Sequence, residues 1–134
     1  MENKTSPAFY ETPDGKEIIC TLSCCADKEP CFSCCGTEMK KMTPNTTDGA
    51  KEKHVPVVTR EGDTVKVAVG DIYHPMEEDH SIAWIYLETC CGGRFRKLKP
   101  GQEPTAVFPL AEGETPVAAY AYCNLHGFWK TDIA

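Results

Sequence analysis

The chain has 134 residues with a formal net charge of −6, and 41% of the residues are hydrophobic. This length suits one domain, or one domain with a small additional module, and the hydrophobic content is sufficient for a core. The negative charge argues against nonspecific binding to nucleic acid or to an anionic membrane, and no apolar stretch approaches the ~18 residues of a membrane span. The polar N-terminus lacks the apolar segment of a secretory signal, so we expect a cytoplasmic protein.

Cysteines are concentrated near the N-terminus, where six of the nine fall in CTLSCCADKEPCFSCC, between Cys20 and Cys35. In the cytoplasm thiols stay reduced, so such a cluster binds metal or performs redox chemistry more often than it forms disulfides. The later stretch TPNTTDGAKEK has the composition of a linker, which predicts a boundary near residue 43. We therefore expect a cysteine-rich metal-binding module at residues 1–43 and a second domain at residues 44–134.

Beyond the linker, short apolar or alternating stretches are separated by turn sequences such as REGD, CCGG, KPGQ and AEGE. About seven strands at this spacing, without a convincing helix, predict an all-β fold, an immunoglobulin-like antiparallel β-sandwich. The expected strands are 55–58, 63–70, 81–88, 93–99, 104–110, 115–123 and 127–133.

All four histidines lie at strand ends or in loops of this predicted sandwich. His54 precedes the first strand, and His74 and His80 bracket PMEED between two strands. His126 follows Cys123 in CNLHG, a spacing at which one tight turn can present both side chains to a single metal ion. Binding sites commonly form in loops held by a rigid scaffold, so this distribution predicts one histidine-rich metal site.

Three segments, EKHVPVV, HPMEEDHSIAWI and CNLHGFW, resemble in order and spacing the signature segments of the superoxide reductases, the neelaredoxin and desulfoferrodoxin family. The resemblance covers roughly residues 44–134, and CCGTEMKKM resembles the end of the desulforedoxin-like module of some members. It implies one-electron reduction of superoxide to hydrogen peroxide at a mononuclear non-haem iron. The family's iron has four imidazole ligands and an axial thiolate, which correspond here to His54, His74, His80, His126 and Cys123.

The resemblance also gives roles to the two residues before the first histidine. Lys53 is suited to attract superoxide and orient a water, and Glu52 is suited to occupy the sixth position of ferric iron. The alternative for both is an ordinary solvated lead-in to a strand. The family further implies a rubredoxin-like electron donor, a homo-oligomer (dimer or tetramer) and an anaerobic or microaerophilic host. An electron-transfer protein without superoxide turnover and a zinc-stabilised binding module are the alternative functions.

The N-terminal cysteines depart from the desulforedoxin pattern of a C-x-x-C pair and an adjacent C-C pair. Cys34 and Cys35 fit the second pair, but Cys20 and Cys24 are one residue too far apart for the first. A [4Fe–4S] cluster tolerates varied spacing and is therefore favoured over Fe(Cys)₄ or zinc, with a vestigial or disulfide-bonded module as the third alternative. The predicted ligands are Cys20, Cys24, Cys34 and Cys35, with Cys31 as a substitute.

The remaining cysteines have no assigned role. Cys25 is an additional thiol in the N-terminal cluster, and Cys90 and Cys91 form an adjacent pair in a CCGG turn. We expect neither Cys90 nor Cys91 to be a metal ligand.

Overall fold

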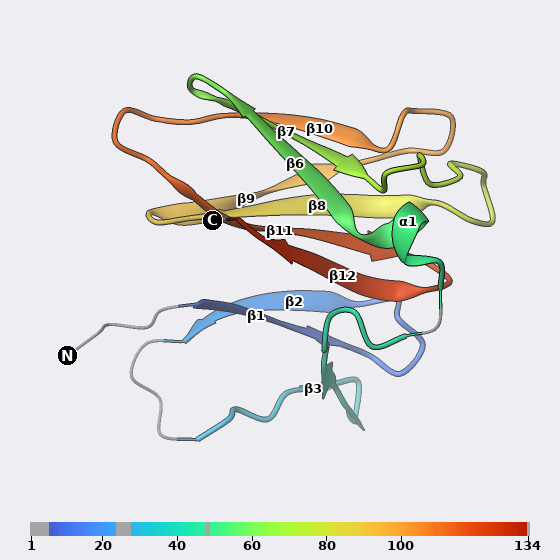
Figure 1. The fold of residues 1–134 in the computed structure, drawn as a ribbon. Helices are drawn as coiled ribbons and strands as arrows, with labels where there is room; N and C mark the ends of the chain where they lie inside the picture. Colours follow the sequence, from blue (N-terminus) through green and yellow to red (C-terminus); the bar gives the residue numbers. More distant parts are fainter. Residues whose placement is uncertain (1–5, 24–27, 48, 134) are drawn as a thin grey trace. The chain divides into compact units, whose positions relative to one another are not determined.

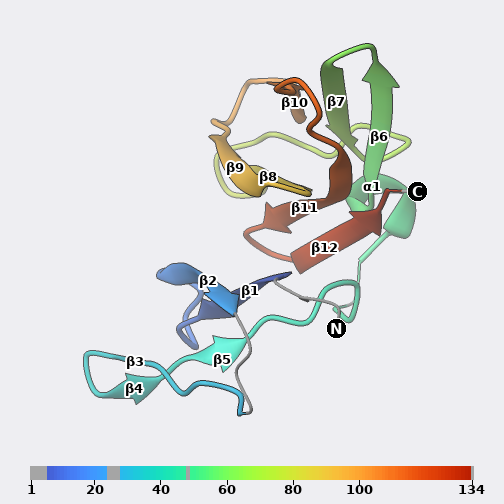
Figure 2. The same cartoon turned by 90° about the vertical axis from the view of Figure 1, so that its left-hand side faces the viewer.

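The computed structural model describes residues 6–23, 28–47 and 49–133. The chain forms two compact units, Met1–Thr43 and Pro44–Ala134. Strands dominate both units (Figures 1 and 2). Among the described residues, no helix has the length and apolar character needed to cross a bilayer.

The N-terminal unit contains a three-stranded antiparallel sheet of order β2-β1-β5 and a small hairpin of β3 and β4. Its core includes the buried Phe9, Tyr10, Met39 and Met42, with the ring of Phe32 against Tyr10 at a centroid distance of 4.9 Å. The strands are β1 (Ser6–Glu11), β2 (Ile18–Ser23), β3 (Ser33–Cys34), β4 (Thr37–Glu38) and β5 (Lys40–Lys41).

The C-terminal unit is a sandwich of seven strands in two antiparallel sheets, which confirms the predicted fold class. One sheet has the order β10-β7-β6 and the other the order β12-β11-β8-β9 (Figure 1). The strands are β6 (Pro56–Glu61), β7 (Thr64–Val69), β8 (Ile82–Thr89), β9 (Gly92–Lys97), β10 (Thr105–Pro109), β11 (Pro116–Cys123) and β12 (Gly127–Asp132).

The core of this unit lies between the two sheets and follows from the alternation of side chains along each strand. Val65, Val67 and Val69 of β7 are fully buried, as are Ile85 of β8 and Ala121 of β11. Each large apolar side chain removed from water contributes about 1.5–3 kcal/mol to the gross burial term. The core therefore makes the sandwich a rigid support for the loops that leave its ends.

A single helical turn, α1 (Lys51–His54), stands before the first strand, where the sequence showed no convincing helix. The amide of Val55 donates to the carbonyl of Lys51 and closes this turn, after which Pro56 begins β6. Four residues carry too little periodicity to identify a helix from sequence. In Figure 1, α1 lies at the end of the sandwich where β6 begins and β11 ends.

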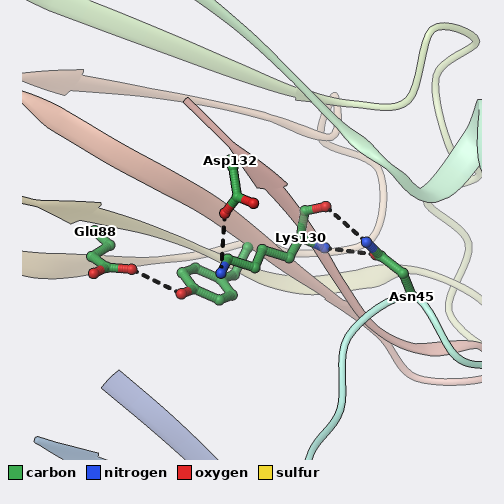
Figure 3. Close-up of polar contacts among 5 residues, drawn as sticks. Asn45, Glu88, Lys130 and Asp132 are labelled. Carbon is green, nitrogen blue, oxygen red and sulfur yellow. Dashed lines mark hydrogen bonds and ion pairs between the residues drawn. The ribbon is translucent and has the colours of Figure 1, made fainter. Parts of the chain in front are cut away.

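Asn45 fixes the segment that leads to α1 (Figure 3). Its side-chain amide donates to the carbonyl of Lys130 at 3.1 Å, and its side-chain oxygen accepts from the amide of Lys130 at 2.9 Å. The side chain of Lys130 contacts Asp132 at 3.1 Å. The Asn45 side chain thus pairs with the backbone of β12 as a neighbouring strand would, and this pairing fixes the position of the residues that follow Asn45.

Candidate metal centre

Four histidines and one cysteine from three separate segments converge at one end of the C-terminal sandwich. One potential ligand atom from each residue lies within 4.8 Å of the others. His54 ends α1, and the loop from β7 to β8 carries His74 and His80. Cys123 ends β11, and His126 lies in the turn from β11 to β12. The structure therefore brings together all five residues that the sequence predicted as ligands of the catalytic iron.

The imidazole rings close a cycle in the order His54, His74, His80, His126. Their centroid distances around the cycle are 4.6, 4.6, 5.1 and 4.8 Å. Neighbouring rings meet edge to face, with interplanar angles from 66° to 81°. Because each ring contacts the next, His54 and His80 occupy opposite corners, and so do His74 and His126.

The distances between donor atoms match those expected around one metal ion. His54 Nε2 lies 3.1 Å from His74 Nε2 and 3.1 Å from His126 Nδ1. Metal–imidazole bonds of about 2.1 Å at right angles would place neighbouring nitrogens about 3.0 Å apart. Cys123 Sγ lies 3.3 Å from His74 Nε2 and 3.8 Å from His126 Nδ1, as expected for a fifth donor beside the ring of nitrogens.

Backbone carbonyl groups fix the orientation of two of these rings. His54 Nδ1 lies 2.7 Å from the carbonyl oxygen of Ala50, and His74 Nδ1 lies 2.6 Å from that of Pro75. A carbonyl oxygen can only accept, so Nδ1 must carry the proton in both rings and Nε2 presents its lone pair to the centre. Two lone pairs that face each other without a proton repel, and a cation between them removes that repulsion.

His80 supplies an independent indication of a ligand. Its Nε2 atom is buried and has no hydrogen-bond partner within the described part of the chain. A buried polar atom without a partner costs about 1–3 kcal/mol, which a bond to a metal ion would offset. The residues present therefore fit a mononuclear metal ion.

The site offers five donor atoms, four of which are nitrogens from the cycle of imidazoles. This arrangement differs from the tetrahedral geometry of a structural zinc site. The five donors suit a metal of higher coordination number that can accept a further ligand, and imidazole with thiolate is a donor set that iron accepts. Cys123 is fully buried, whereas His80 and His126 are half-buried. The sulfur donor is therefore shielded from solvent, whereas the side chains of His80 and His126 are partly exposed.

Burial also sets the protonation of the ligands. Desolvation lowers the pKa of His74 to about 4, and it lowers the pKa of His54 although the hydrogen bond to Ala50 opposes it. Both rings are therefore neutral and able to bind a metal near pH 7. Desolvation raises the pKa of the Cys123 thiol, so binding of a metal there must release a proton.

Trp129 and Gly49 form the wall behind His54. The Trp129 ring stacks on His54 at a centroid distance of 4.9 Å, and its indole nitrogen donates to the carbonyl of His126 at 3.1 Å. A methyl group on Gly49 would lie 3.2 Å from the His54 ring and 3.3 Å from Cβ of His126. The sequence does not single out either residue, because a tryptophan in a strand and a glycine in a linker are common in domains without a metal site.

Gly70 determines how closely α1 approaches the centre. Its φ is +90°, and a Cβ atom there would lie 2.6 Å from the backbone of Lys53. Two residues after Gly70, the amide of Ile72 donates to the carbonyl of Glu52 at 3.1 Å. Only glycine permits such an approach, so Gly70 positions the helical turn that ends in His54.

Glu52 and Lys53 are exposed on the turn that carries the buried His54. The charge of Glu52 acts on the ring, because it opposes the fall in the pKa of His54. These two residues accordingly lie next to a ligand but do not belong to the group of five.

The N-terminal cysteines form no comparable group in the part of the chain that the structure describes. Cys20 and Cys35 are exposed and Cys34 is half-buried, and the sulfur atoms of Cys34 and Cys35 lie 4.0 Å apart. The predicted ligand Cys24, like Cys25, falls outside the described residues. The four-thiolate centre, with Cys31 as a substitute ligand, therefore stays a prediction.

The desulfoferrodoxin family model matches residues 46–132. A desulfoferrodoxin homologue from Archaeoglobus fulgidus is 52% identical over 99 residues, which cover 73% of this chain and 77% of the relative. A superoxide reductase from Pyrococcus horikoshii is 39% identical over an alignment that covers 71% of this chain and 97% of the relative. The chain belongs to the desulfoferrodoxin family, which confirms the resemblance noted in its sequence.

Solved structures show the same fold. The superoxide reductase from Treponema pallidum superposes with a TM-score of 0.80 at 33% identity, covering 95% of this chain and 99% of that chain. A superoxide reductase from Giardia intestinalis gives a TM-score of 0.53 at 36% identity and covers 62% of this chain and 98% of that chain. The fold and the five-residue centre together define a non-haem iron protein.

Gly70→Ala tests the positioning of α1. We expect this variant to bind iron roughly 10–100-fold more weakly, as for other changes that disturb the support of a ligand. Gly62→Ala is a matched control, because Gly62 also has a positive φ of +59° but has nothing within 4 Å of the added methyl group. Gly62→Ala should lose on the order of 1 kcal/mol of stability and keep its iron affinity. Equal iron affinities in the two variants would contradict the role of Gly70.

Proposed function

We propose that this chain is a superoxide reductase that adds one electron and two protons to superoxide and releases hydrogen peroxide. The observation that carries the proposal is the convergence of four imidazoles and one buried thiol in a desulfoferrodoxin-family domain. His54, His74, His80, His126 and Cys123 would hold the iron. When bound, the iron would supply one-electron chemistry and a sixth position open to the substrate, which Zn²⁺ cannot supply because it has no redox chemistry.

The protein's own groups set the charge of this centre. Four neutral imidazoles add no charge and a Cys123 thiolate adds one negative charge, so a ferrous site carries about +1 and attracts an anion. The thiolate is a soft, electron-rich donor whose burial strengthens its electrostatic effect. The side chains of His80 and His126 are partly exposed, and they are proposed to border the route by which superoxide enters and water delivers protons.

Lys53 and Glu52 are proposed to act at different stages. The ammonium group of Lys53 would concentrate the anionic substrate near the centre against the overall charge of −6 and would orient a water that gives a proton. The carboxylate of Glu52 would occupy the sixth position of ferric iron after the peroxide has left. The close approach at Gly70 supports both roles, because it fixes the turn on which they lie.

The N-terminal unit, residues 1–43, is proposed to be a second redox module in addition to the catalytic domain of residues 44–134. Four of the residues Cys20, Cys24, Cys31, Cys34 and Cys35 would bind a [4Fe–4S] cluster, which accepts the irregular spacing better than Fe(Cys)₄ does. A rubredoxin-like carrier would donate the electrons. The enzyme would work in the cytoplasm of an anaerobic or microaerophilic cell and would be a dimer or tetramer. The alternative is an iron electron-transfer protein without superoxide turnover.

Cys123→Ser tests the thiolate. We expect the visible charge-transfer band of the ferric centre to disappear and the rate constant for superoxide to fall by about 100-fold or more, since even indirect disturbance of a ligand costs 10–100-fold. Cys91→Ser is the control, because it also replaces a thiol with a hydroxyl but in an exposed turn. An unchanged visible spectrum in Cys123→Ser would exclude Cys123 as a ligand.

Lys53→Ala and Glu52→Ala separate substrate attraction from ligand exchange. Lys53→Ala should slow the second-order reaction of the ferrous enzyme about tenfold at low salt and flatten its dependence on ionic strength, because salt screens the lost attraction. Glu52→Ala should react at nearly the normal rate and show an altered ferric spectrum. Pulse radiolysis at two salt concentrations measures both, with Lys51→Ala as a control from the same turn. Normal rates in Lys53→Ala would leave Lys53 as an ordinary solvated residue.

Iron and sulfide analysis tests the N-terminal cluster. With a [4Fe–4S] cluster and one catalytic iron, the chain should contain about five irons and about four acid-labile sulfides. Cys34→Ser should reduce the iron towards about one without changing the spectrum of the catalytic centre. One or two irons without sulfide would exclude the cluster and favour a mononuclear or absent N-terminal centre.

A further inference from the structure

Two adjacent cysteines lie far from the metal centre, in the turn that joins β8 to β9. Cys90 and Cys91 are both exposed, and their sulfur atoms are 3.0 Å apart. Figure 1 shows this turn at the opposite end of the sandwich from α1. Strand β8 spans seven residue steps, or about 23 Å, and separates the pair from the β8 end that adjoins the centre. The pair therefore cannot share the catalytic metal ion.

The turn holds the Cys90 sulfur among hydrogen-bond donors. The amide of Thr115 donates to Cys90 Sγ at 3.3 Å, and the amide of Cys90 donates to the carbonyl of Thr115 at 2.9 Å. Thr89 reinforces this contact, because its hydroxyl donates to the Glu114 carboxylate at 2.6 Å and accepts from the Cys91 amide at 3.2 Å. The two thiols are thus held together rather than presented on a loose loop.

The surroundings make the two sulfur atoms chemically unequal. Hydrogen bonds from Cys91 and Thr115 lower the pKa of Cys90, although desolvation and the charge of Glu114 act in the opposite direction. The contact with Cys90 raises the pKa of Cys91. The thiolate is the reactive form of cysteine, so these hydrogen bonds favour Cys90 over Cys91 as the nucleophile.

We propose that Cys90 and Cys91 form a peroxide-reactive dithiol that is oxidised to a disulfide between neighbouring residues. The oxidant is hydrogen peroxide. Its supply at this site rests on the proposed function, because hydrogen peroxide is the product of superoxide reduction. Exposure lets peroxide reach Cys90, and the 3.0 Å distance between the sulfur atoms places Cys91 within reach of a sulfenic acid on Cys90. The site lies in the catalytic domain and needs no metal.

The reaction has two balanced steps. The Cys90 thiolate attacks one oxygen of hydrogen peroxide, an S–O bond forms, the O–O bond breaks, and the leaving hydroxide takes a proton to become water. The Cys91 sulfur then attacks the Cys90 sulfenic acid, an S–S bond forms, and the hydroxyl group leaves as a second water with the proton of Cys91. Two thiols and one peroxide become one disulfide and two waters, and two electrons pass from sulfur to oxygen.

The disulfide should be easily reduced again. Adjacent Cα atoms are about 3.8 Å apart, below the span of about 4.4–6.8 Å that an unstrained disulfide requires. Strained and exposed disulfides have more oxidising potentials and are the labile ones. A cellular dithiol reductant would therefore restore the pair, so the site can respond reversibly to peroxide.

Peptide mapping of the full chain tests this proposal. Trypsin cleaves after Lys66 and Arg94 and releases residues 67–94, in which Cys90 and Cys91 are the only cysteines. After treatment with added hydrogen peroxide, this peptide should be lighter by two hydrogens and should resist alkylation. This oxidation should proceed faster than the oxidation of glutathione in the same tube. A dithiol reductant should restore alkylation of both residues. Persistence of both thiols after the glutathione has been oxidised would overturn the proposal, as would a link to another peptide.

Single variants identify the nucleophile. In Cys91→Ser, a sulfenic-acid reagent such as dimedone should label Cys90, and in Cys90→Ser it should label Cys91 at least about tenfold less. Equal labelling would contradict the assigned roles and overturn the proposal as stated. Because peroxide is added directly, the result is independent of superoxide turnover, which the Cys123→Ser measurement tests separately. Both variants should reduce superoxide at the normal rate.

Discussion

The mutual approach of unprotonated nitrogen atoms is the interaction on which this structure depends. His54 Nε2 and His74 Nε2 face each other at 3.1 Å, and each ring already donates its only proton to a backbone carbonyl. No hydrogen bond can join two lone pairs, so these rings repel unless a cation lies between them, and burial in a medium of low dielectric constant increases the repulsion. A metal ion converts this repulsion into attraction, and the rigid sandwich therefore holds its ligands ready for one.

The architecture explains how so short a domain assembles five ligands. Each ligand lies within a few residues of a strand end, where the backbone leaves the sheet but is still fixed by it. The tight turn from β11 to β12 fixes Cys123 and His126 together, since Cys123 pairs directly with Gly127. The contact at Gly70 fixes His54 against β7 in a comparable way. The five ligands thus lie at one end of the sandwich and leave the packing of its hydrophobic core unbroken.

Much of this arrangement was predictable from the sequence. Alternating valines in β7 and regularly spaced turn sequences predicted the sandwich, because a period of two and frequent turns leave few other folds. The histidines were predicted as ligands because CNLHG and the segments around His54 and His74 resemble a known family. The pattern identifies residue types and spacing, which is sufficient where a short turn determines the geometry.

Other features depend on contacts between distant segments, which a single sequence does not contain. The helical turn that ends in His54 forms because Gly70 admits it, and the two residues are far apart in the chain. The stacking of Trp129 on His54 and the choice of tautomer at His74 likewise follow from tertiary packing. The N-terminal strand β1 carries few alternating apolar residues, so its pairing with β2 was not anticipated.

Anomalous diffraction from crystals of the iron-loaded protein tests the central claim most directly. Data collected on both sides of the iron absorption edge should show one peak inside the histidine cycle, about 2.1 Å from one nitrogen of each ring and about 2.3 Å from Cys123 Sγ. That result would establish a single iron held by all five residues. A peak that appears only at the zinc edge, or an iron that lacks Cys123 or any of the four rings as a ligand, would contradict the account.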